Sequence, residues 1–337
     1  MRNLQSYRSR ALISLLATLI IVQLMAVSHA AGPLPSWTDN PAKESIIQFV
    51  KTVTDKSSPN YVPPEDRIAV FDNDGTLWTE QPIPFQFAFA IDRVKELAPQ
   101  HPEWKNEQPF KAILENDRTY RAKATLQDVG KIIMATHAGM TTDEFQNTVS
   151  NWIATARHPR FQRPYTDLVY QPMLELLIYL RTNGFKTFIV SGGTSDFMRP
   201  WVENVYSIPP EQVVGSSLVT EYEMQNRKPF LKILPKVDFI DDKAGKPVGI
   251  HKFIGRRPVM AVGNSDGDLQ MLQYTAGGSG IREMLLIHHT DANREYAYDK
   301  GTEEALKAAR ENGWTVIDMQ RDWKVIYPFE IKKERGK

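Results

Sequence analysis

Three short segments of the sequence place carboxylate, amide and hydroxyl residues directly after apolar runs. Their polar residues are Asp72 and Asp74, Ser191 and Gly192, and Asn264 and Asp268. Each preceding run is short and mostly apolar, which is typical of a buried parallel strand. Because ligands of a doubly wound sheet bind beyond the carboxyl ends of its strands, we expect these residues to meet at one edge of a sheet.

The residue types in these segments suit the handling of a phosphate group. Clustered carboxylates repel one another unless a cation or a proton lies between them, and oxygen ligands without histidine or thiolate favour a hard ion such as Mg²⁺. The Ser191 hydroxyl and the N–H groups around Gly192 could hold a phosphate. A carboxylate such as Asp72 could attack phosphorus, and a second acid such as Asp74 could protonate the leaving oxygen.

The three segments resemble motifs of the haloacid dehalogenase-like superfamily, in the expected order over residues 66–320. The first motif matches VFDNDGT at residues 70–76, the second matches IVSGG at 189–193, and the fourth matches GNSDGD at 263–268. The resemblance is greatest to the phosphoserine phosphatase-like branch, in which a helical cap lies between the first two motifs. The helical block of this sequence from Phe85 to about Arg163 occupies that place.

The resemblance implies a role for each matched residue. Asp72 is the expected nucleophile, and Asp74 the general acid and base whose backbone carbonyl also binds the metal. Ser191 and Gly192 are expected to hold phosphoryl oxygens, together with a lysine that also steadies the nucleophile. Lys246 fits that lysine better than Lys252, although both remain open. The implied cofactor is Mg²⁺, and its expected ligands are Asp72, Asp74, Asn264 and Asp268.

Asn264 departs from the family pattern, because the first residue of the fourth motif is usually an acid. An uncharged amide predicts weaker metal binding, or a larger share of that task for Asp268. Asp74 separates the chain from the dehalogenases, which lack an acid there, and from the transport ATPases, which carry threonine. We therefore expect a phosphatase that acts on a small-molecule phosphate ester. The alternatives are a catalytically weakened binding protein and a phosphotransferase that uses the same aspartate.

The first thirty residues have the pattern of a secretory signal peptide. A head containing Arg2, Arg8 and Arg10 precedes the apolar run 11–27, and small residues lead up to Ala30. We expect cleavage after Ala30 and a periplasmic or secreted protein that meets the membrane only through this segment. An uncleaved membrane anchor is the alternative.

Strand and helix signals alternate along most of the remaining chain, and this predicts a doubly wound, Rossmann-like α/β core with an inserted helical cap. The expected domains are a core of residues 31–84 and 164–337 and a cap of residues 85–163. Helices are expected at 42–54, 85–97, 104–116, 126–137, 142–155, 171–182, 196–206 and 302–312. Residues 217–250 are harder to interpret, and a hairpin is possible there.

Composition excludes several classes of function. The chain has 337 residues and no cysteine, which rules out thiolate catalysis and cysteine-ligated zinc. Its formal net charge of +1 gives no sign of a surface for nucleic acid. Asp241 and Asp242 resemble a solvated turn, and a metal-binding role for His288 and His289 is less expected than local hydrogen bonding.

Overall fold

The computed structural model describes residues 32–121 and 123–331. The chain divides into two compact units, Met1–Pro35 and Ser36–Lys337, and the fold described below is that of the second unit. The predicted signal peptide, residues 1–30, lies outside the described residues. Within the described ranges, every helix is too short or too polar to traverse a lipid bilayer.

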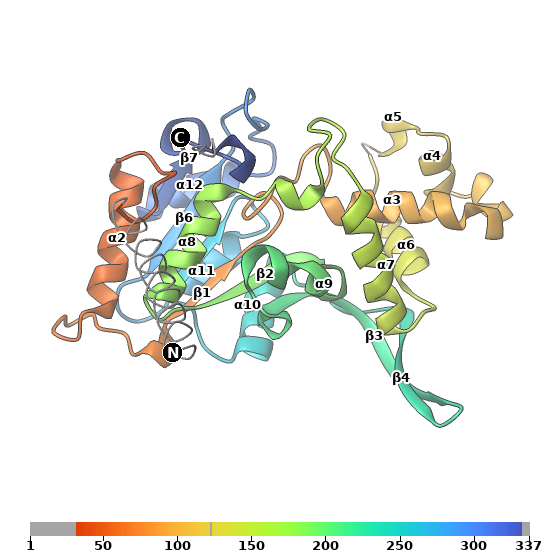
Figure 1. Ribbon diagram of the computed structural model, residues 1–337, viewed down its shortest axis with the longest axis horizontal. Coiled ribbons are helices and arrows are strands. Elements are labelled where there is room, and N and C mark those ends of the chain that lie inside the picture. Colours follow the sequence, from red (N-terminus) through yellow and green to blue (C-terminus); the bar gives the residue numbers. More distant parts are fainter. Residues whose placement is uncertain (1–31, 122, 332–337) are drawn as a thin grey trace, which may run out of the picture. The chain divides into compact units, whose positions relative to one another are not determined.

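A seven-stranded sheet forms the centre of the second unit, with the strand order β4-β3-β2-β1-β5-β6-β7 (Figure 1). All neighbouring strands are parallel except β3 and β4, which form an antiparallel pair. The strands are β1 Ile68–Phe71, β2 Lys186–Thr194, β3 Val213–Gln225, β4 Lys228–Phe239, β5 Met260–Gly263, β6 Glu283–His288 and β7 Thr315–Asp318. The predicted α/β sheet is confirmed.

The order of the strands reverses next to β1. From β1 the chain first builds β2 and β3 on one side and later β5, β6 and β7 on the other. Phe71 is level with Ile189 of β2 and with Val262 of β5, so β1 and β5 end almost together, while β2 continues to Thr194 and places Ser191 just beyond that level. Such a switch point is where open α/β sheets bind ligands.

Helices flank the sheet. One face is covered by α11 Leu269–Ala276, by α12 Glu303–Asn312 and by Ile250, which directly follows α10 Gly245–Gly249. Apolar side chains of these helices pack on alternate residues of the strands, among them Ile68 and Val70. Burying each large apolar side chain contributes about 1.5–3 kcal/mol. Helix α8 Gln171–Thr182 packs on β2, and α2 Pro41–Thr54 packs on β7.

A block of helices separates β1 from α8 in the sequence. It consists of α3 Phe85–Leu97, α4 Phe110–Leu114, α5 Arg118–Arg121, α6 Leu126–His137 and α7 Thr142–Thr155. The predicted helix 104–116 is wrong. A 3₁₀ turn, Pro102–Lys105, and the short α4 replace it, because Pro109 lacks an N–H and cannot continue a helix. The predicted cap boundaries, 84/85 and 163/164, stay a prediction.

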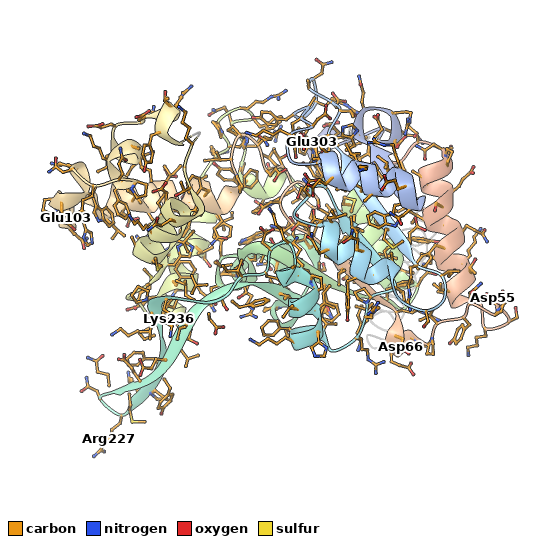
Figure 2. All side chains as sticks on the ribbon, turned by 180° about the vertical axis from the view of Figure 1, so that it is seen from behind. Asp55, Asp66, Glu103, Arg227, Lys236 and Glu303 are labelled. Carbon is orange, nitrogen blue, oxygen red and sulfur yellow. The ribbon has the colours of Figure 1, made fainter. Side chains whose placement is uncertain are left out.

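Strands β3 and β4 extend past the sheet as a long hairpin, with Arg227 at its turn (Figure 2). The possible hairpin in residues 217–250 is therefore present, and its pairing runs from Ser217 to Phe239, whereas the first residues of β3 pair with β2. The hairpin also contacts the helical block, because Gly139 N–H donates to the Ile233 carbonyl and Ile233 N–H to the Met140 carbonyl, at 2.9 and 3.0 Å. Helix α9, Ser195–Tyr206, follows β2 directly.

Candidate active site

Lys246 lies at the centre of a buried charge cluster at the switch point. Its Nζ donates to Asp72 Oδ1 and to Asp268 Oδ1, both at 2.6 Å, and to the Val190 carbonyl at 3.0 Å. Helix α10 carries Lys246, and all three charged side chains are nearly inaccessible to solvent. Lys252, in contrast, is exposed over the rings of Phe239 and Phe253. The structure thus brings Lys246, and not Lys252, to the predicted nucleophile.

Asp268 anchors the loop that follows β5. Its Oδ2 accepts from the backbone N–H groups of Asn264 and Ser265 at 2.9 and 3.1 Å, while Oδ1 accepts from Lys246. Both carboxylate oxygens are therefore engaged by donors of the protein itself. The role of Asp268 as a metal ligand stays a prediction.

A second group of polar side chains surrounds Gly193. A Cβ atom placed on this glycine would lie 3.1 Å from Gln86 Oε1, 3.4 Å from Ser191 Oγ and 3.9 Å from Asp74 Oδ2. Asp74 Oδ1 accepts from Trp78 Nε1 at 2.7 Å, which fixes the carboxyl group. The sequence motifs that contain Asp74 and Ser191 therefore meet in space. Gly192 lies beside them, is exposed, and accepts at its carbonyl from Ser216 Oγ at 2.8 Å.

Gln86 connects the helical block to this site, and sequence patterns did not single it out. Its Oε1 accepts from the Thr194 N–H at 2.8 Å, and its Nε2 donates to Thr194 Oγ1 at 2.7 Å and to His137 Nε2 at 3.0 Å. Since His137 Nε2 accepts, its Nδ1–H donates to Thr136 Oγ1, 2.8 Å away. Burial lowers the pKa of His137 to about 3, which keeps the ring neutral.

Asn264 lies at the end of β5 against the loop of Asp72 and Asp74. Its Oδ1 accepts from Thr76 Oγ1 at 3.0 Å, and its Nδ2 donates to Glu80 Oε1 at 3.0 Å. Tyr298 OH donates to the same Glu80 oxygen at 2.5 Å. Gly75, at φ +73°, lies beneath these side chains, and a Cβ atom there would overlap the Asn264 amide.

His289 supports the nucleophile loop by hydrogen bonding. Its Nε2 lies 2.8 Å from the Gly75 carbonyl, its Nδ1 lies 3.1 Å from Glu295 Oε2, and the ring is buried. His288 instead pairs with Asp299 at 2.6 Å. The expected preference for local hydrogen bonding over metal binding fits both histidines.

The predicted solvated turn at Asp241 and Asp242 is wrong for Asp241. That side chain is fully buried, near the backbone of Ser191 and the charge of Lys246. Burial raises the pKa of Asp241 to about 7, and the nearby charge of Lys246 opposes the rise. Asp242 is exposed, as expected. The sequence pattern failed because residue 241, which follows the end of β4, lies in the interior of the protein.

Burial also raises the pKa values of the other carboxyl groups. Desolvation, and then the charge of Asp268, raise the pKa of Asp72, against the opposing effect of Lys246. Desolvation raises the pKa of Asp74 to about 6 and that of Glu80 to about 7. Burial lowers the pKa of Lys246, but Asp268 and Asp72 together raise it above its usual value. One lysine is thus left to balance several buried acids.

Because the buried carboxyl groups of the site outnumber its lysine, the site favours a bound cation. Among residues 32–121 and 123–331, no three His, Asp or Glu side chains are grouped so as to hold a metal by themselves. Magnesium needs less than that, because it takes one or two carboxylates and completes its shell with water and substrate phosphate. The Asp72 carboxylate, the Asp74 carbonyl and the Asn264 amide oxygen are donors of the required kind. The residues present therefore fit the expected ion.

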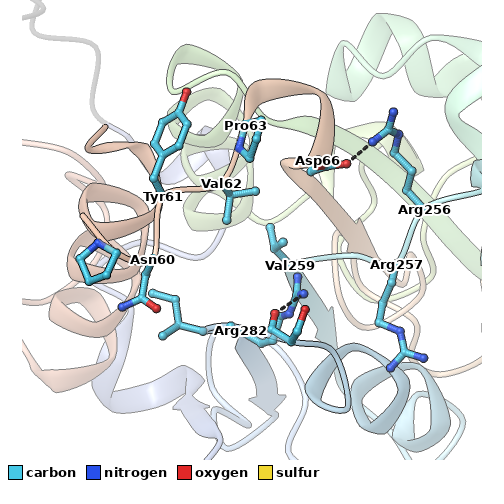
Figure 3. A pocket seen from close by; sticks show the side chains of 13 residues that line it. Asn60, Tyr61, Val62, Pro63, Asp66, Arg256, Arg257, Val259 and Arg282 are labelled. Carbon is cyan, nitrogen blue, oxygen red and sulfur yellow. Dashed lines mark hydrogen bonds and ion pairs between the residues drawn. The ribbon is translucent and has the colours of Figure 1, made fainter. Parts of the chain in front are cut away.

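A surface cavity lies away from this site. It has a volume of about 400 Å³ and is lined by residues before β1, β5 and β6, including Asp66, Arg256 and Arg282 (Figure 3). It lies at the amino ends of these strands, the sheet edge opposite Asp72. The ion pair between Asp66 and Arg256 lies at its wall.

Comparison with known proteins agrees with this arrangement. A family model described as haloacid dehalogenase-like hydrolase matches residues 69–273. The chain belongs to this family. The match begins one strand residue into β1 and ends inside α11, so it covers the loops of Asp72, Ser191, Lys246 and Asn264. A search of curated proteins found no significant match.

Solved structures of this hydrolase family's fold resemble the chain at low sequence identity. A conserved protein of unknown function from Anaerococcus prevotii DSM 20548 matches with a TM-score of 0.56 and 19% identity, over 82% of this chain and 91% of that one. A phosphoserine phosphohydrolase-like protein from Francisella tularensis subsp. tularensis SCHU S4 matches with a TM-score of 0.39 and 16% identity, over 76% and 95%. The first similarity supports the fold alone, and the second is too weak to support either fold or function.

Proposed function

We propose that this protein is an exported, Mg²⁺-dependent phosphatase that hydrolyses a small-molecule phosphate monoester through an aspartyl phosphate on Asp72. The observation that carries the proposal is the ion pair between Lys246 Nζ and Asp72 Oδ1, 2.6 Å long, at the switch point of a haloacid dehalogenase-like sheet. A buried, charge-paired carboxylate at a ligand-binding position is a candidate for a catalytic role.

In the first step, Asp72 attacks phosphorus. Lys246 binds Oδ1, so Oδ2 is the oxygen that is free of this ion pair. An Oδ2–P bond forms while the bond from phosphorus to the ester oxygen breaks. Asp74 donates its proton to the departing oxygen, which leaves as an alcohol.

In the second step, water hydrolyses the acyl phosphate. Asp74, now a carboxylate, takes a proton from the water as its oxygen attacks phosphorus, and the bond to Asp72 breaks. Inorganic phosphate leaves, and both acids return to their starting states. A pKa of about 6 suits Asp74 to both roles, because it can lose and regain a proton near neutral pH.

Ser191 and Lys246 would hold the phosphoryl oxygens during both steps. A Mg²⁺ ion at Asp72, the Asp74 carbonyl and Asn264 would neutralise charge on the phosphate and orient it for in-line attack. Gln86 reaches the same space from the helical block, so these helices can shield the site and contact the leaving group.

Export is proposed on the pattern of residues 1–30 alone. Mass spectrometry of the protein purified from an expressing bacterium tests it, since the mature chain should begin at residue 31. An intact amino terminus would contradict cleavage.

A phosphate-release screen tests the proposed activity. The mature protein should release phosphate from at least one class of ester with Mg²⁺ and lose this activity with a chelator. Addition of alcohols distinguishes a phosphotransferase, which would form new phosphate esters. Absence of release from every ester, with Mg²⁺, Mn²⁺ or Co²⁺, would favour the binding protein instead.

A further inference from the structure

The Asn264 side chain is held in one orientation by two partners with opposite requirements. An amide carries an acceptor at one end and donors at the other. Thr76 Oγ1 faces Oδ1 at 3.0 Å, and the Glu80 carboxylate faces Nδ2 at 3.0 Å. A reversed amide would bring its oxygen against the oxygen of Glu80. Glu80 therefore keeps the Asn264 nitrogen on its own side and leaves the carbonyl oxygen facing Thr76, in the loop that follows Asp74.

Glu80 is itself firmly held. Tyr298 OH donates to its Oε1 at 2.5 Å, and the Tyr298 ring stacks on His289 with ring centres 4.5 Å apart. The carboxylate also lies close to the backbone of the nucleophile loop, since a Cβ on Gly75 would be 2.7 Å from Glu80 Oε1. This position brings an ionisable carboxyl group within one hydrogen bond of an uncharged amide.

We propose that Glu80 is the positioning residue of the cation site: it fixes the orientation of the Asn264 amide, whose oxygen would bind the ion, and in its ionised form it supplies the negative charge that Asn264 lacks. The inference rests on the proposed function, because it concerns the same ion. Outer residues that orient metal ligands typically change metal affinity by about 10–100-fold when they are replaced. Glu80→Gln should therefore weaken metal binding by about this factor.

Metal binding without substrate tests this assignment. Mn²⁺ is titrated into the metal-free mature protein, and free Mn²⁺ is measured by electron paramagnetic resonance. The proteins are the wild type, Glu80→Gln, Asn264→Asp and the double variant. Tyr298→Phe is the matched control, because it removes the other hydrogen bond to Glu80 Oε1 and leaves Asn264 in contact with Glu80. Thermal unfolding of each protein checks that it is folded.

We expect the effect of Glu80→Gln on Mn²⁺ affinity to depend on which residue occupies position 264. Glu80→Gln weakens Mn²⁺ binding about 10–100-fold in the wild-type background. In the Asn264→Asp background the same change leaves binding unaltered or strengthens it, because two adjacent carboxylates repel each other. Tyr298→Phe changes the affinity much less than Glu80→Gln does.

Two results would overturn the assignment. Glu80→Gln could bind Mn²⁺ as the wild type does, or it could lose the same factor in both backgrounds, which a general structural role would produce. If the wild type binds no Mn²⁺, the proposed metal-dependent function fails as well, so the two failures are distinguishable. If Glu80→Gln does not fold, Glu80→Asp takes its place, with weakening expected in the wild-type background only.

Discussion

Replacement of Lys246 by methionine should destabilise the fold in a manner that depends on pH. Lys246 Nζ lies 2.6 Å from both Asp72 Oδ1 and Asp268 Oδ1, and it is the cation that both buried carboxylates share. Methionine fills similar space without a charge. Breaking a buried ion pair by removing one partner costs about 3–5 kcal/mol, a large part of the roughly 5–15 kcal/mol that stabilises a typical domain.

The loss should be larger at pH 8 than at pH 5. Without Lys246, the folded-state pKa of Asp72 rises further above that of the unfolded chain. The folded variant then binds more protons than the unfolded one, so its stability falls as pH rises through this range. Protonation at pH 5 therefore restores part of the stability.

Urea unfolding of the metal-free proteins at pH 5 and pH 8 measures the effect, with a chelator present so that no cation replaces the lysine. Lys252→Met is the matched control, since Lys252 follows soon after Lys246 and is exposed. Its expected loss is below about 1 kcal/mol. A loss for Lys246→Met that equals the control, or that does not change with pH, would refute the charge balance described above.

Three further outcomes follow from the site. Asp74→Asn should lower turnover of an aryl phosphate about 10²–10⁴-fold and accumulate phosphoenzyme, because a good leaving group departs without the acid but water then lacks its base. Between pH 7 and pH 5, the free energy of unfolding of the wild type should fall by about 2 kcal/mol relative to that of His137→Gln. The reason is that the unfolded ring takes up a proton below its ordinary pKa of 6.5, while the folded ring, with a pKa of about 3, does not. Gln86→Ala should lower the free energy of unfolding, measured with urea, by about 1–3 kcal/mol, because it leaves the buried Thr194 N–H without its hydrogen-bond partner.

Each of these outcomes has its own contrary result. Wild-type turnover in Asp74→Asn would exclude proton transfer by that acid. Parallel pH profiles of stability for the wild type and His137→Gln would show that His137 does not stay neutral in the fold. An unchanged unfolding midpoint in Gln86→Ala would show that the contact between Gln86 and Thr194 adds nothing to stability.

The sequence predicts those parts of the fold that depend on local patterns. Apolar runs before Asp72, Ser191 and Asn264 predict strands, and the aligned ends of parallel strands predict that the loops meet. Periodic apolar residues give the bounds of α3, α6 and α7 as observed. Segment 104–116 has the same periodicity, but Pro109 interrupts it.

Contacts between distant residues could not be predicted in this way. Tyr298 forms a hydrogen bond with Glu80, 218 positions away in the sequence, and Gln86 forms one with Thr194, 108 positions away. Both pairs depend on how loops and helices pack above the sheet, which no local pattern reports. Asp241 was misjudged for the same reason, because its turn-like and exposed neighbours do not reveal that Asp241 itself is buried.

The most direct test of the account is the identification of the phosphorylated residue. Enzyme quenched in acid during turnover is digested, and its peptides are analysed by mass spectrometry. The account predicts one added phosphoryl group on the peptide of β1 and its loop, located on Asp72 and absent from Asp72→Asn, which should also have no turnover. Phosphate release by Asp72→Asn at the wild-type rate, or a phosphoryl group on a different residue, would contradict it.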